Sequence, residues 1–464
     1  MNADSQSAPA PAKDAETSKS TRNRRIGYAL IILAATIVGA IQILMALPLR
    51  SANDRSRWAT VWSLVERGTY QIDEIDSQRF QIEGRKGKHG WGTIDKVKHE
   101  KHFYSTKPPL FPTLVAGLYW TVKKTLDWDI YRDGWIDARV TRLILLLVNL
   151  VPTIVCLILL AAILERHARS NLTRYFVLST AAFATLLVPF LGILNNHTVG
   201  AYSAMFALYA MIRVIVDGKR KPVYFALCGF WAAFTCCNEL PAALFGLATF
   251  GLMLRTCRRQ TLVWFVPAAL VPLVGFFYTN YLATGGWKPF YLYYGTEKYN
   301  FVQNGRESYW MNPKGIDKGG DAPWSYFLHC TVGHHGILSL TPVYLLTLLA
   351  WFRLGRYRDF KLRPIMMLGL ALSVCVLGFY LTRTGNYNYG GVSVALRWML
   401  WLTPFWLIAM IPLTDDLAKS DWFPGLAVII LLVSLFSAWY PHANPWQHPW
   451  LFQVMEWADL IHYD

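Results

Sequence analysis

Two long blocks of residues without a single charge constrain this chain more than any other feature of its sequence. Residues 26–48 and 143–164 carry only uncharged side chains, and each block is about as long as a helix that crosses a bilayer. Hydrophobic residues make up 54% of the 464 residues and charged residues only 16%, where a soluble domain carries about 25%. These properties exclude an ordinary water-soluble enzyme and predict an all-α polytopic membrane protein.

The remaining apolar blocks extend this prediction to about 11 transmembrane helices. We expect spans near residues 26–48, 142–164, 174–194, 198–216, 222–237, 240–254, 261–283, 336–352, 364–382, 398–414 and 422–440. Together they form one membrane domain over residues 26–440.

The charged residues predict how this domain is oriented. A net charge of +16 suits a nucleic acid partner, but basic clusters beside membrane spans have a simpler explanation in the positive-inside rule. Five clusters fall on one side of the predicted spans: Arg22, Arg24 and Arg25; Arg166, Arg169 and Arg174; Lys219, Arg220 and Lys221; Arg255, Arg258 and Arg259; and Arg353, Arg356, Arg358, Lys361 and Arg363. We therefore expect a cytoplasmic N-terminus and no nucleic acid partner.

The segments outside the spans differ in length. Residues 1–25 have no apolar run and predict a disordered cytoplasmic tail, and residues 441–464 predict a short extracytoplasmic tail. Two outer loops, residues 49–139 and 284–335, are far longer than a connection requires. Because long ordered loops usually carry function, we expect the site there.

Two amphipathic helices are expected in the first outer loop. In the segment RSRWATVWSLVERG, apolar residues repeat at i, i+3, i+4 and i+7 from Trp58, which is typical of a helix lying on the membrane surface. A second short helix should follow the prolines of the KPP segment and run over residues 110–124.

Asp54 is the first acidic residue after the first span. A carboxylate held there can take a proton from an acceptor hydroxyl. Asn53 and Asp54 also precede a helical pattern, so a helix N-cap explains the same residue without any chemistry. Position alone favours the cap.

Lys107 stands directly before Pro108 and Pro109. Next to the free N–H groups of a helix N-terminus, its ammonium favours an anionic phosphate. A lysine that snorkels at the membrane interface is an equally good explanation.

Other polar residues follow the outer ends of the spans. They are Asn195, Asn196 and His197; Glu239; the pair His334 and His335; and the segment from Arg383 to Arg397, with Glu100 in the first loop as a further acid. We expect several of them to line one outward cavity. Adjacent histidines diverge on a helix, so no metal site is predicted.

Several of these residues lie in motifs that resemble the GT-C glycosyltransferases. The motifs are an acidic residue after the first span, the VERGTY stretch, KPP before a surface helix, and GGVSVALR followed by an apolar span with Pro404. The pattern is similar to the protein O-mannosyltransferases and the aminoarabinose transferases of lipid A. The resemblance implies an enzyme of the bacterial cytoplasmic (inner) membrane that works at the outer face.

The resemblance also implies roles for individual residues. The donor is a sugar linked to a polyprenyl phosphate, and the acceptor is a hydroxyl of a glycan, a lipid or a protein. Asp54 matches the catalytic aspartate, Lys107 the donor-phosphate lysine and Arg397 a donor-phosphate contact. Arg383 and His335 are further groups that neutralise the leaving phosphate. The remaining polar residues of the outer ends, Glu100, Asn196, His197, Glu239 and His334, then line the substrate cavity.

The sequence departs from this family at the positions that would hold a metal. Arg55 stands where many members have a second acid, and residues 195–197 offer Asn, Asn and His where metal-dependent members have carboxylates. No cofactor is firmly implied, and dependence on a divalent metal is doubtful.

Two other functional classes stay open. A secondary transporter needs charged or broken helices at mid-membrane, and the predicted spans carry almost no charges. A polysaccharide polymerase or ligase also has many spans and Arg-rich outer loops. KPP in the first loop favours the glycosyltransferase over both.

Overall fold

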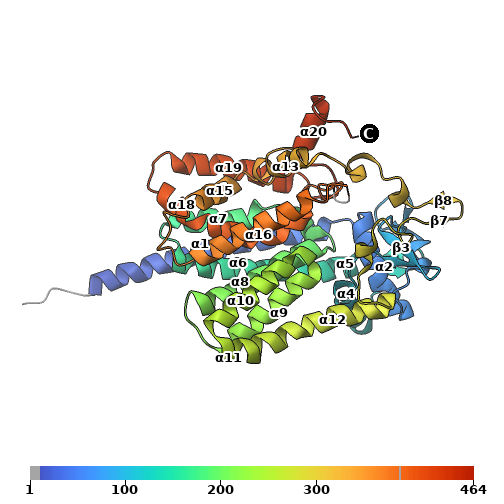
Figure 1. Cartoon of the computed structure of the whole chain (residues 1–464), viewed down its shortest axis with the longest axis horizontal. Coiled ribbons are helices and arrows are strands. Elements are labelled where there is room, and N and C mark those ends of the chain that lie inside the picture. Colours follow the sequence, from blue (N-terminus) through green and yellow to red (C-terminus); the bar gives the residue numbers. More distant parts are fainter. Residues whose placement is uncertain (1–10, 386–387, 464) are drawn as a thin grey trace, which may run out of the picture.

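Apolar helices form most of the structure, a computed structural model that describes residues 11–385 and 388–463. They run alongside one another, while the strands and the short helices α2 and α4 gather at one end of this bundle (Figure 1). The bundle contains α1 (Pro11–Met45), α5 (Ala138–Leu145), η1 (Leu146–Leu150), α6 (Val151–His167), α7 (Asn171–Phe183), α8 (Asn196–Ile215), α9 (Pro222–Asn238), α10 (Ala243–Thr256), α11 (Arg258–Gln260), η4 (Thr261–Phe265), α12 (Val266–Thr284), α15 (Tyr344–Phe352), α16 (Arg363–Leu381) and α19 (Phe423–Trp439).

The chain is an integral membrane protein. Six helical segments of the described chain are long and apolar enough to cross a bilayer, and a bent pair makes a seventh. The six are Ser20–Met45, Ala138–His167, Asn171–Gly192, Asn196–Ile215, Arg258–Thr284 and Arg363–Leu381, and the bent pair is Arg397–Ala409 with Ile411–Leu417. Pro222–Asn238, Leu240–Thr256 and Phe423–Trp439 are shorter apolar helices, so the count of 11 spans is not confirmed.

Prolines break several of the predicted spans. The span expected over residues 336–352 divides into α14 (Ile337–Leu340) and α15, with Pro342 between them. The span over residues 398–414 divides into η8 (Arg397–Leu402), α17 (Thr403–Ala409) and α18 (Ile411–Leu417). Pro404 and Pro412 each occupy the second position of a new helix, because proline lacks the N–H that a continuing helix needs.

The first outer loop contains the two predicted helices and also strands that the all-α prediction missed. The helices are α2 (Ala52–Arg67) and α4 (Leu110–Leu126), with a short α3 (Asp73–Asp76). A four-stranded sheet has the order β2 (His89–Gly90), β1 (Arg79–Ile82), β6 (Trp135–Ile136) and β5 (Tyr131–Arg132), and β3 (Lys96–His99) pairs with β4 (His102–Ser105) as a hairpin. All of these strands are too short to show an alternating pattern in the sequence.

The apolar face of α2 is covered by protein. Trp58 and Val61 are 1% and 0% exposed, and they belong to one buried cluster with Val115 and Tyr119 of α4. The prediction that α2 lies with this face on the membrane is therefore wrong, because α4 packs against the apolar stripe instead.

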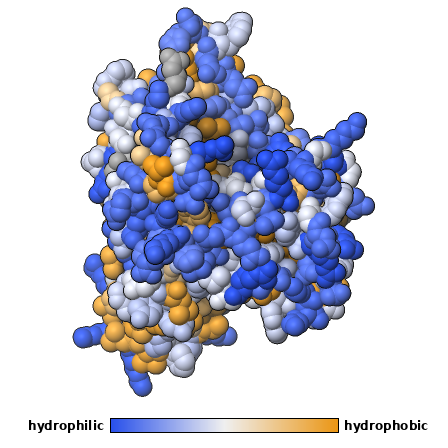
Figure 2. Space-filling model, turned by 90° about the vertical axis from the view of Figure 1, so that its right-hand side faces the viewer, coloured by the Kyte–Doolittle hydropathy of each residue, from blue (hydrophilic) through white to orange (hydrophobic). Residues whose placement is uncertain are grey.

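The second long outer loop and the C-terminal segment complete the same end of the molecule, whose surface is mostly hydrophilic (Figure 2). The loop contains η5 (Phe290–Tyr293), the hairpin β7 (Val302–Gln303) and β8 (Arg306–Glu307), η6 (Tyr309–Met311), η7 (Gly315–Lys318) and α13 (Pro323–Thr331). The predicted C-terminal tail contains α20 (Trp450–Trp457). A hydrophilic end is what the aqueous phase beside a membrane requires.

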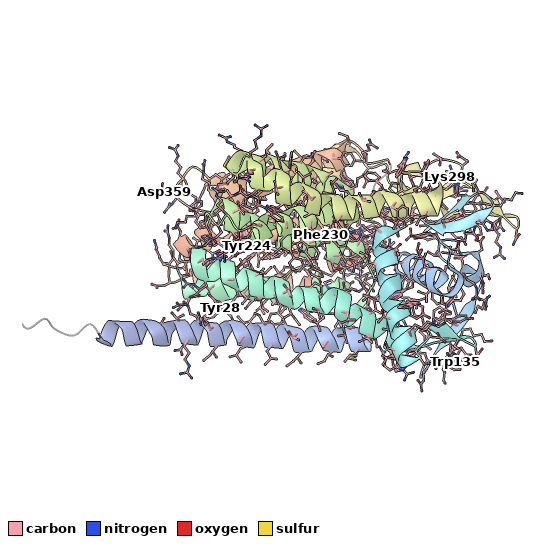
Figure 3. All side chains as sticks on the ribbon, turned by 90° about the horizontal axis from the view of Figure 1, so that it is seen from below. Tyr28, Trp135, Tyr224, Phe230, Lys298 and Asp359 are labelled. Atoms are coloured by element: carbon pink, nitrogen blue, oxygen red, sulfur yellow. The ribbon has the colours of Figure 1, made fainter. Side chains whose placement is uncertain are left out.

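The basic clusters gather at the opposite end. Tyr28, Tyr224 and Asp359 lie toward that end, while Trp135 and Lys298 lie at the hydrophilic end (Figure 3). Arg24 and Arg174 come from different helices and both contact Glu165, at 2.8 and 3.7 Å. That this basic end faces the cytoplasm stays a prediction.

The N-terminal tail differs from the prediction. Residues 1–10 lie outside the described residues, but α1 begins at Pro11, so residues 11–25 are helical and the predicted disordered tail is too long. The segment contains Ala, Lys, Glu and Arg, all good helix formers, and no Pro or Gly between Pro11 and the apolar block at Ile26. The membrane helix can therefore continue outward.

Candidate functional site

Asp54 lies in the first turn of α2 with both of its carboxylate oxygens held. Ser51 is the N-cap, and its hydroxyl accepts a hydrogen bond from the Asp54 N–H at 3.1 Å. The Asp54 Oδ2 atom accepts from the N–H of Arg50 at 3.1 Å, and Oδ1 accepts from the N–H of Leu194 at 2.9 Å. Burial raises the pKa of Asp54 to about 6, although these two N–H groups act against the rise. Asp54 therefore ties α2 to the segment that enters α8.

Arg57 lies one turn further along α2 and is 2% exposed. It donates to the backbone oxygen of Asn53 at 3.0 Å and to the side-chain oxygens of Asn53 and Asn196. No carboxylate of the described residues lies within 4.0 Å of its guanidinium. Burial lowers the pKa of Arg57 to about 10, so the group is still charged at neutral pH. Sequence reasoning missed Arg57, although it lies three residues after Asp54 on the same helix face.

Lys107 stands between β4 and α4, where the KPP segment was expected to start a helix. Its Nζ lies 3.2 Å from Oδ1 of Asp95, and only 18% of its side chain is exposed. Burial lowers the pKa of Lys107 to about 8; Asp95 opposes this, and the charges of Arg57 and Arg397 lower it further. Lys107, Arg57 and Arg397 come from distant segments and are thus close enough at one site for their charges to interact.

Asp95 is a second residue that sequence reasoning missed. It is 9% exposed, and its backbone oxygen accepts from the Ser56 hydroxyl at 2.6 Å and from the Thr106 N–H at 3.2 Å. The hairpin of β3 and β4 pairs Lys96 with Ser105, which brings Asp95 back beside Lys107. A prediction of this hairpin from the sequence would have placed Asp95 beside Lys107.

Arg397 begins η8 and is partly buried. Its Nε donates to the Gly390 carbonyl at 2.9 Å, a second guanidinium nitrogen donates to the same oxygen, and the group lies 4.5 Å from the centre of the Trp446 ring. The glycine has a φ of +98°, and a Cβ there would lie 2.9 Å from the carbonyl oxygen of Ala395. The backbone therefore approaches too closely here for a side chain, which explains the glycine. Within the described chain, Arg397 has no carboxylate within 4.0 Å either.

A cluster of polar side chains connects the start of α8 to the break between α9 and η3 (Leu240–Ala242). Asn196 donates to Oε1 of Glu239 at 3.0 Å, and Nδ1 of His197 lies 2.6 Å from the same oxygen. Glu239 stands where the chain was predicted to turn, directly after α9 ends at Asn238. Asn196 also accepts from Arg57, so Asn196, His197 and Glu239 share one site with the cations.

Glu100 and Arg383 lie outside this site. Glu100 occupies the two-residue turn of the β3–β4 hairpin, with a φ of +49° and 81% of its side chain exposed. Arg383 is exposed just beyond the end of α16, and its guanidinium lies 5.2 Å from the centre of the Phe379 ring. Glu100 lies at the tip of the hairpin, away from Lys107. Arg383 lies against Phe379 of its own helix α16. The spacing of these residues in the sequence did not predict either position.

His334 and His335 pack in a buried aromatic cluster. Nε2 of His334 lies 3.1 Å from the Tyr463 hydroxyl, and Nε2 of His335 lies 3.1 Å from the Ser393 carbonyl oxygen. Burial lowers the pKa of His334 and lowers that of His335 to about 3, so both rings are neutral at pH 7. Nδ1 of His335 faces Nδ1 of His334, so both nitrogens of His335 have partners inside this cluster, and its role at the phosphate stays a prediction.

A large cleft lies elsewhere. It has a volume of about 880 Å³ and is lined by residues such as Trp135, Arg132 and Arg139. Both of these arginines are paired with aspartates, Arg132 with Asp129 and Arg139 with Asp137. We give more weight to the cations around Lys107, because two of them have no such partner. Within the described chain, no three His, Cys, Asp or Glu side chains are grouped so that they can hold a metal ion.

The site combines unpaired positive charge with unused hydrogen-bond donors. Nε1 of Trp401 and Nε1 of Trp446 are buried without a partner among the described residues. Guanidinium groups bind phosphate with two parallel hydrogen bonds, and a buried donor without a partner costs about 1–3 kcal/mol. The arrangement is suited to an anionic ligand that also accepts hydrogen bonds.

Comparison with known proteins gave similarities of structure only. No protein-family model matches the chain, and a comparison with curated proteins found no match. The chain is similar to ArnT from Cupriavidus metallidurans in the apo state, with 13% identity and a TM-score of 0.49 over 87% of this chain and 62% of that one. For ArnT bound to undecaprenyl phosphate the values are 12%, 0.48, 86% and 63%.

The apo oligosaccharyltransferase of Archaeoglobus fulgidus is also similar, with 10% identity and a TM-score of 0.45 over 90% of this chain and 55% of that one. The chain thus spans less than two thirds of the length of these proteins. ArnT and the oligosaccharyltransferase are GT-C superfamily members, the group that the sequence motifs resemble. At these identities and TM-scores, the comparisons add nothing to the assignment of function, which depends on the site itself.

Proposed function

We propose that this chain is an integral-membrane glycosyltransferase. It transfers a sugar from a polyprenyl-phosphate donor to an acceptor hydroxyl of a glycan, a lipid or a protein at the extracytoplasmic face. The observation that carries this proposal is the pair of guanidinium groups, Arg57 and Arg397, that have no carboxylate partner within the described chain. Because an unpaired charge away from water is costly, such groups are typical of a site for an anion.

The three cations suit a reaction in which a phosphate is the leaving group. When the bond between the sugar and the phosphate breaks, the lipid phosphate gains negative charge, and donors fixed in advance stabilise that charge in the transition state. Arg57 and Arg397 supply planar donor groups, and Lys107 supplies a compact charge. The acceptor oxygen attacks the anomeric carbon from the opposite face, so a single displacement inverts the configuration there.

The position of the site agrees with a lipid-linked donor. Lys107 and Asp95 belong to the loop region at the hydrophilic end of the apolar bundle, opposite the basic clusters (Figures 1 and 2). A polyprenyl chain is apolar and a phosphate is charged, so the molecule is expected to bridge such a boundary. The positive-inside rule supports an extracytoplasmic position for this end.

The test is transfer by the purified protein. We expect that one member of a panel of radiolabelled polyprenyl-phosphate sugars yields free polyprenyl phosphate in its presence. Arg397→Met should reduce this release by roughly 10-fold or more, since a charged hydrogen bond to the phosphate is lost. The matched control is Arg383→Met, which removes an exposed arginine outside the site and should release the lipid at the unchanged rate. Equal rates in both variants would contradict the phosphate site.

A further inference from the structure

We infer that helix α13 is inserted into the bilayer leaflet at the hydrophilic end of the molecule, and that this contact holds in place the loop that precedes Arg397. The partner is a lipid surface, and the side chains of α13 that face away from the protein bind it. The contact with lipid goes beyond the proposed function and does not depend on it. Only the effect of this contact on donor binding rests on that function.

One face of α13 is apolar and exposed. Trp324 is 73% exposed, and Phe327 and Leu328 follow it at i+3 and i+4, so the three exposed side chains share one side of the helix. Val332, directly after the helix, is exposed as well. No Asp, Glu, Lys or Arg occurs between residues 322 and 352. An exposed face of this kind is costly in water and is typical of a contact with lipid or with another protein.

The position of α13 favours lipid. The helix packs against α16, which is long and apolar enough to cross a bilayer, and it lies beside the helical bundle, away from the strands of the hydrophilic end (Figure 1). Helix α16 itself exposes apolar side chains such as Val374 and Phe379, as a helix in lipid does. Tryptophan is enriched at the boundary between lipid tails and head groups, which agrees with an exposed Trp324. The exposed face of α13 therefore meets the bilayer.

The buried face of α13 contacts the loop that precedes Arg397. The buried ring of Tyr326 stacks on Tyr389, with 4.6 Å between the ring centroids. The Tyr389 hydroxyl donates to Asp321, two residues before α13 begins. Tyr389 directly precedes Gly390, whose carbonyl oxygen accepts from Nε of Arg397 at 2.9 Å. A helix α13 that is fixed in lipid therefore restrains the carbonyl group that orients the Arg397 guanidinium.

The experiment measures the contact with lipid directly. In a protein without native cysteines, Trp324→Cys is labelled with an environment-sensitive fluorophore. The labelled protein is reconstituted into phosphatidylcholine vesicles, with and without lipids that carry bromine on their acyl chains. We expect the brominated lipids to quench most of the fluorescence at position 324. The same label on Glu100→Cys, in the exposed hairpin turn, is the matched control and should not be quenched.

A charge on the same face should weaken this contact. Phe327→Asp places a carboxylate among lipid tails, which is costly, so the fluorescence of the label at position 324 should become largely insensitive to brominated lipids. Phe327→Leu keeps the face apolar and should leave the quenching unchanged. Because the Phe327 side chain is exposed, neither substitution alters the buried face that contains Tyr326.

Donor binding tests the restraint on Arg397. In vesicles, Phe327→Asp should bind polyprenyl phosphate roughly 10-fold more weakly, while Phe327→Leu should bind it as the wild type does. Absence of quenching at position 324 would refute the lipid contact, and disulfide cross-linking of two chains there would assign the face to a second copy. Unchanged binding by Phe327→Asp would refute the restraint. Failure of the wild type to bind polyprenyl phosphate would refute the proposed function and leave the lipid contact, measured by quenching, unaffected.

Discussion

The ammonium of Lys107 lies 3.2 Å from a carboxylate oxygen of Asp95, and both side chains are largely buried. The two residues flank the β3–β4 hairpin, so the hairpin sets the distance between them. A phosphate that binds Lys107 must compete with this carboxylate. Under the proposed function, this pair should therefore affect both the stability of the loop and the affinity for the donor.

Removal of the Asp95 charge should separate these two effects. We expect Asp95→Asn to bind polyprenyl phosphate more tightly, since the competing carboxylate is gone. The same variant should lose free energy of unfolding, because breaking a buried ion pair costs on the order of 3 kcal/mol. Calorimetric titration and thermal unfolding measure the two quantities, and weaker binding by the variant would contradict competition at Lys107.

The affinity for the donor should depend on pH through Lys107. Because burial lowers its pKa from 10.5 to about 8, the free protein loses the ammonium as the pH rises through about 8. Binding of polyprenyl phosphate should therefore weaken above that pH. Lys107→Arg should bind with little dependence on pH in this range, since arginine stays charged, and Lys107→Met should bind roughly 10-fold more weakly or worse at every pH.

Asp54→Asn should destabilise the protein. Asparagine keeps one acceptor oxygen but places an NH₂ group against a backbone N–H, so one of the two hydrogen bonds is lost, at a cost of about 1–3 kcal/mol. Asp127→Asn is the control, because Asp127 is 90% exposed and its φ of +54° is one that asparagine adopts readily. An Asp54→Asn protein with unchanged stability would contradict this structural role of the two hydrogen bonds.

The stability contribution of Asp54 should also change with pH. Burial raises its pKa from 3.8 to about 6, so the native state holds the proton more tightly than the unfolded chain. This proton-linked contribution adds to that of the hydrogen bonds; it is complete below about pH 4 and is lost as the pH rises through about 6. The difference in unfolding midpoint between wild type and Asp54→Asn, measured over this range, should follow that course. A constant difference would mean that Asp54 titrates like an exposed carboxylate.

The orientation can be tested with exposed positions at opposite ends of the bundle. In a protein without native cysteines, Glu100→Cys should react with an impermeant thiol reagent from outside intact cells, because its side chain is 81% exposed on the outer loop. Asp359→Cys lies at the other end and should react only after permeabilisation (Figure 3). The reverse labelling pattern would contradict the predicted orientation.

Local patterns in the sequence predicted the elements near the site well. Helices α2 and α4 were predicted because their periodicity and the KPP start are properties of consecutive residues. The strands were missed because two to four residues show no period. The break at Glu239 agrees with the gap between the predicted spans 222–237 and 240–254.

The partners of the site residues were harder to predict. Arg57 belongs to the site through Asn196, which is 139 residues away, and Asp95 belongs to it through the pairing of a hairpin. The surroundings of His335 were not predicted, because aromatic rings around it, such as Phe452, come from a distant part of the sequence. Such contacts depend on tertiary packing, which no short window of sequence contains.

The site draws its parts from segments spread over most of the chain, from Arg57 in α2 to Arg397 in η8. During synthesis the first outer loop, with Lys107 in place, emerges long before Arg397. A nascent chain that ends before η8 therefore has only part of the phosphate site and no Trp446 beside it. Under the proposed function, the ability to hold the lipid donor therefore arises only after the late segments have been inserted.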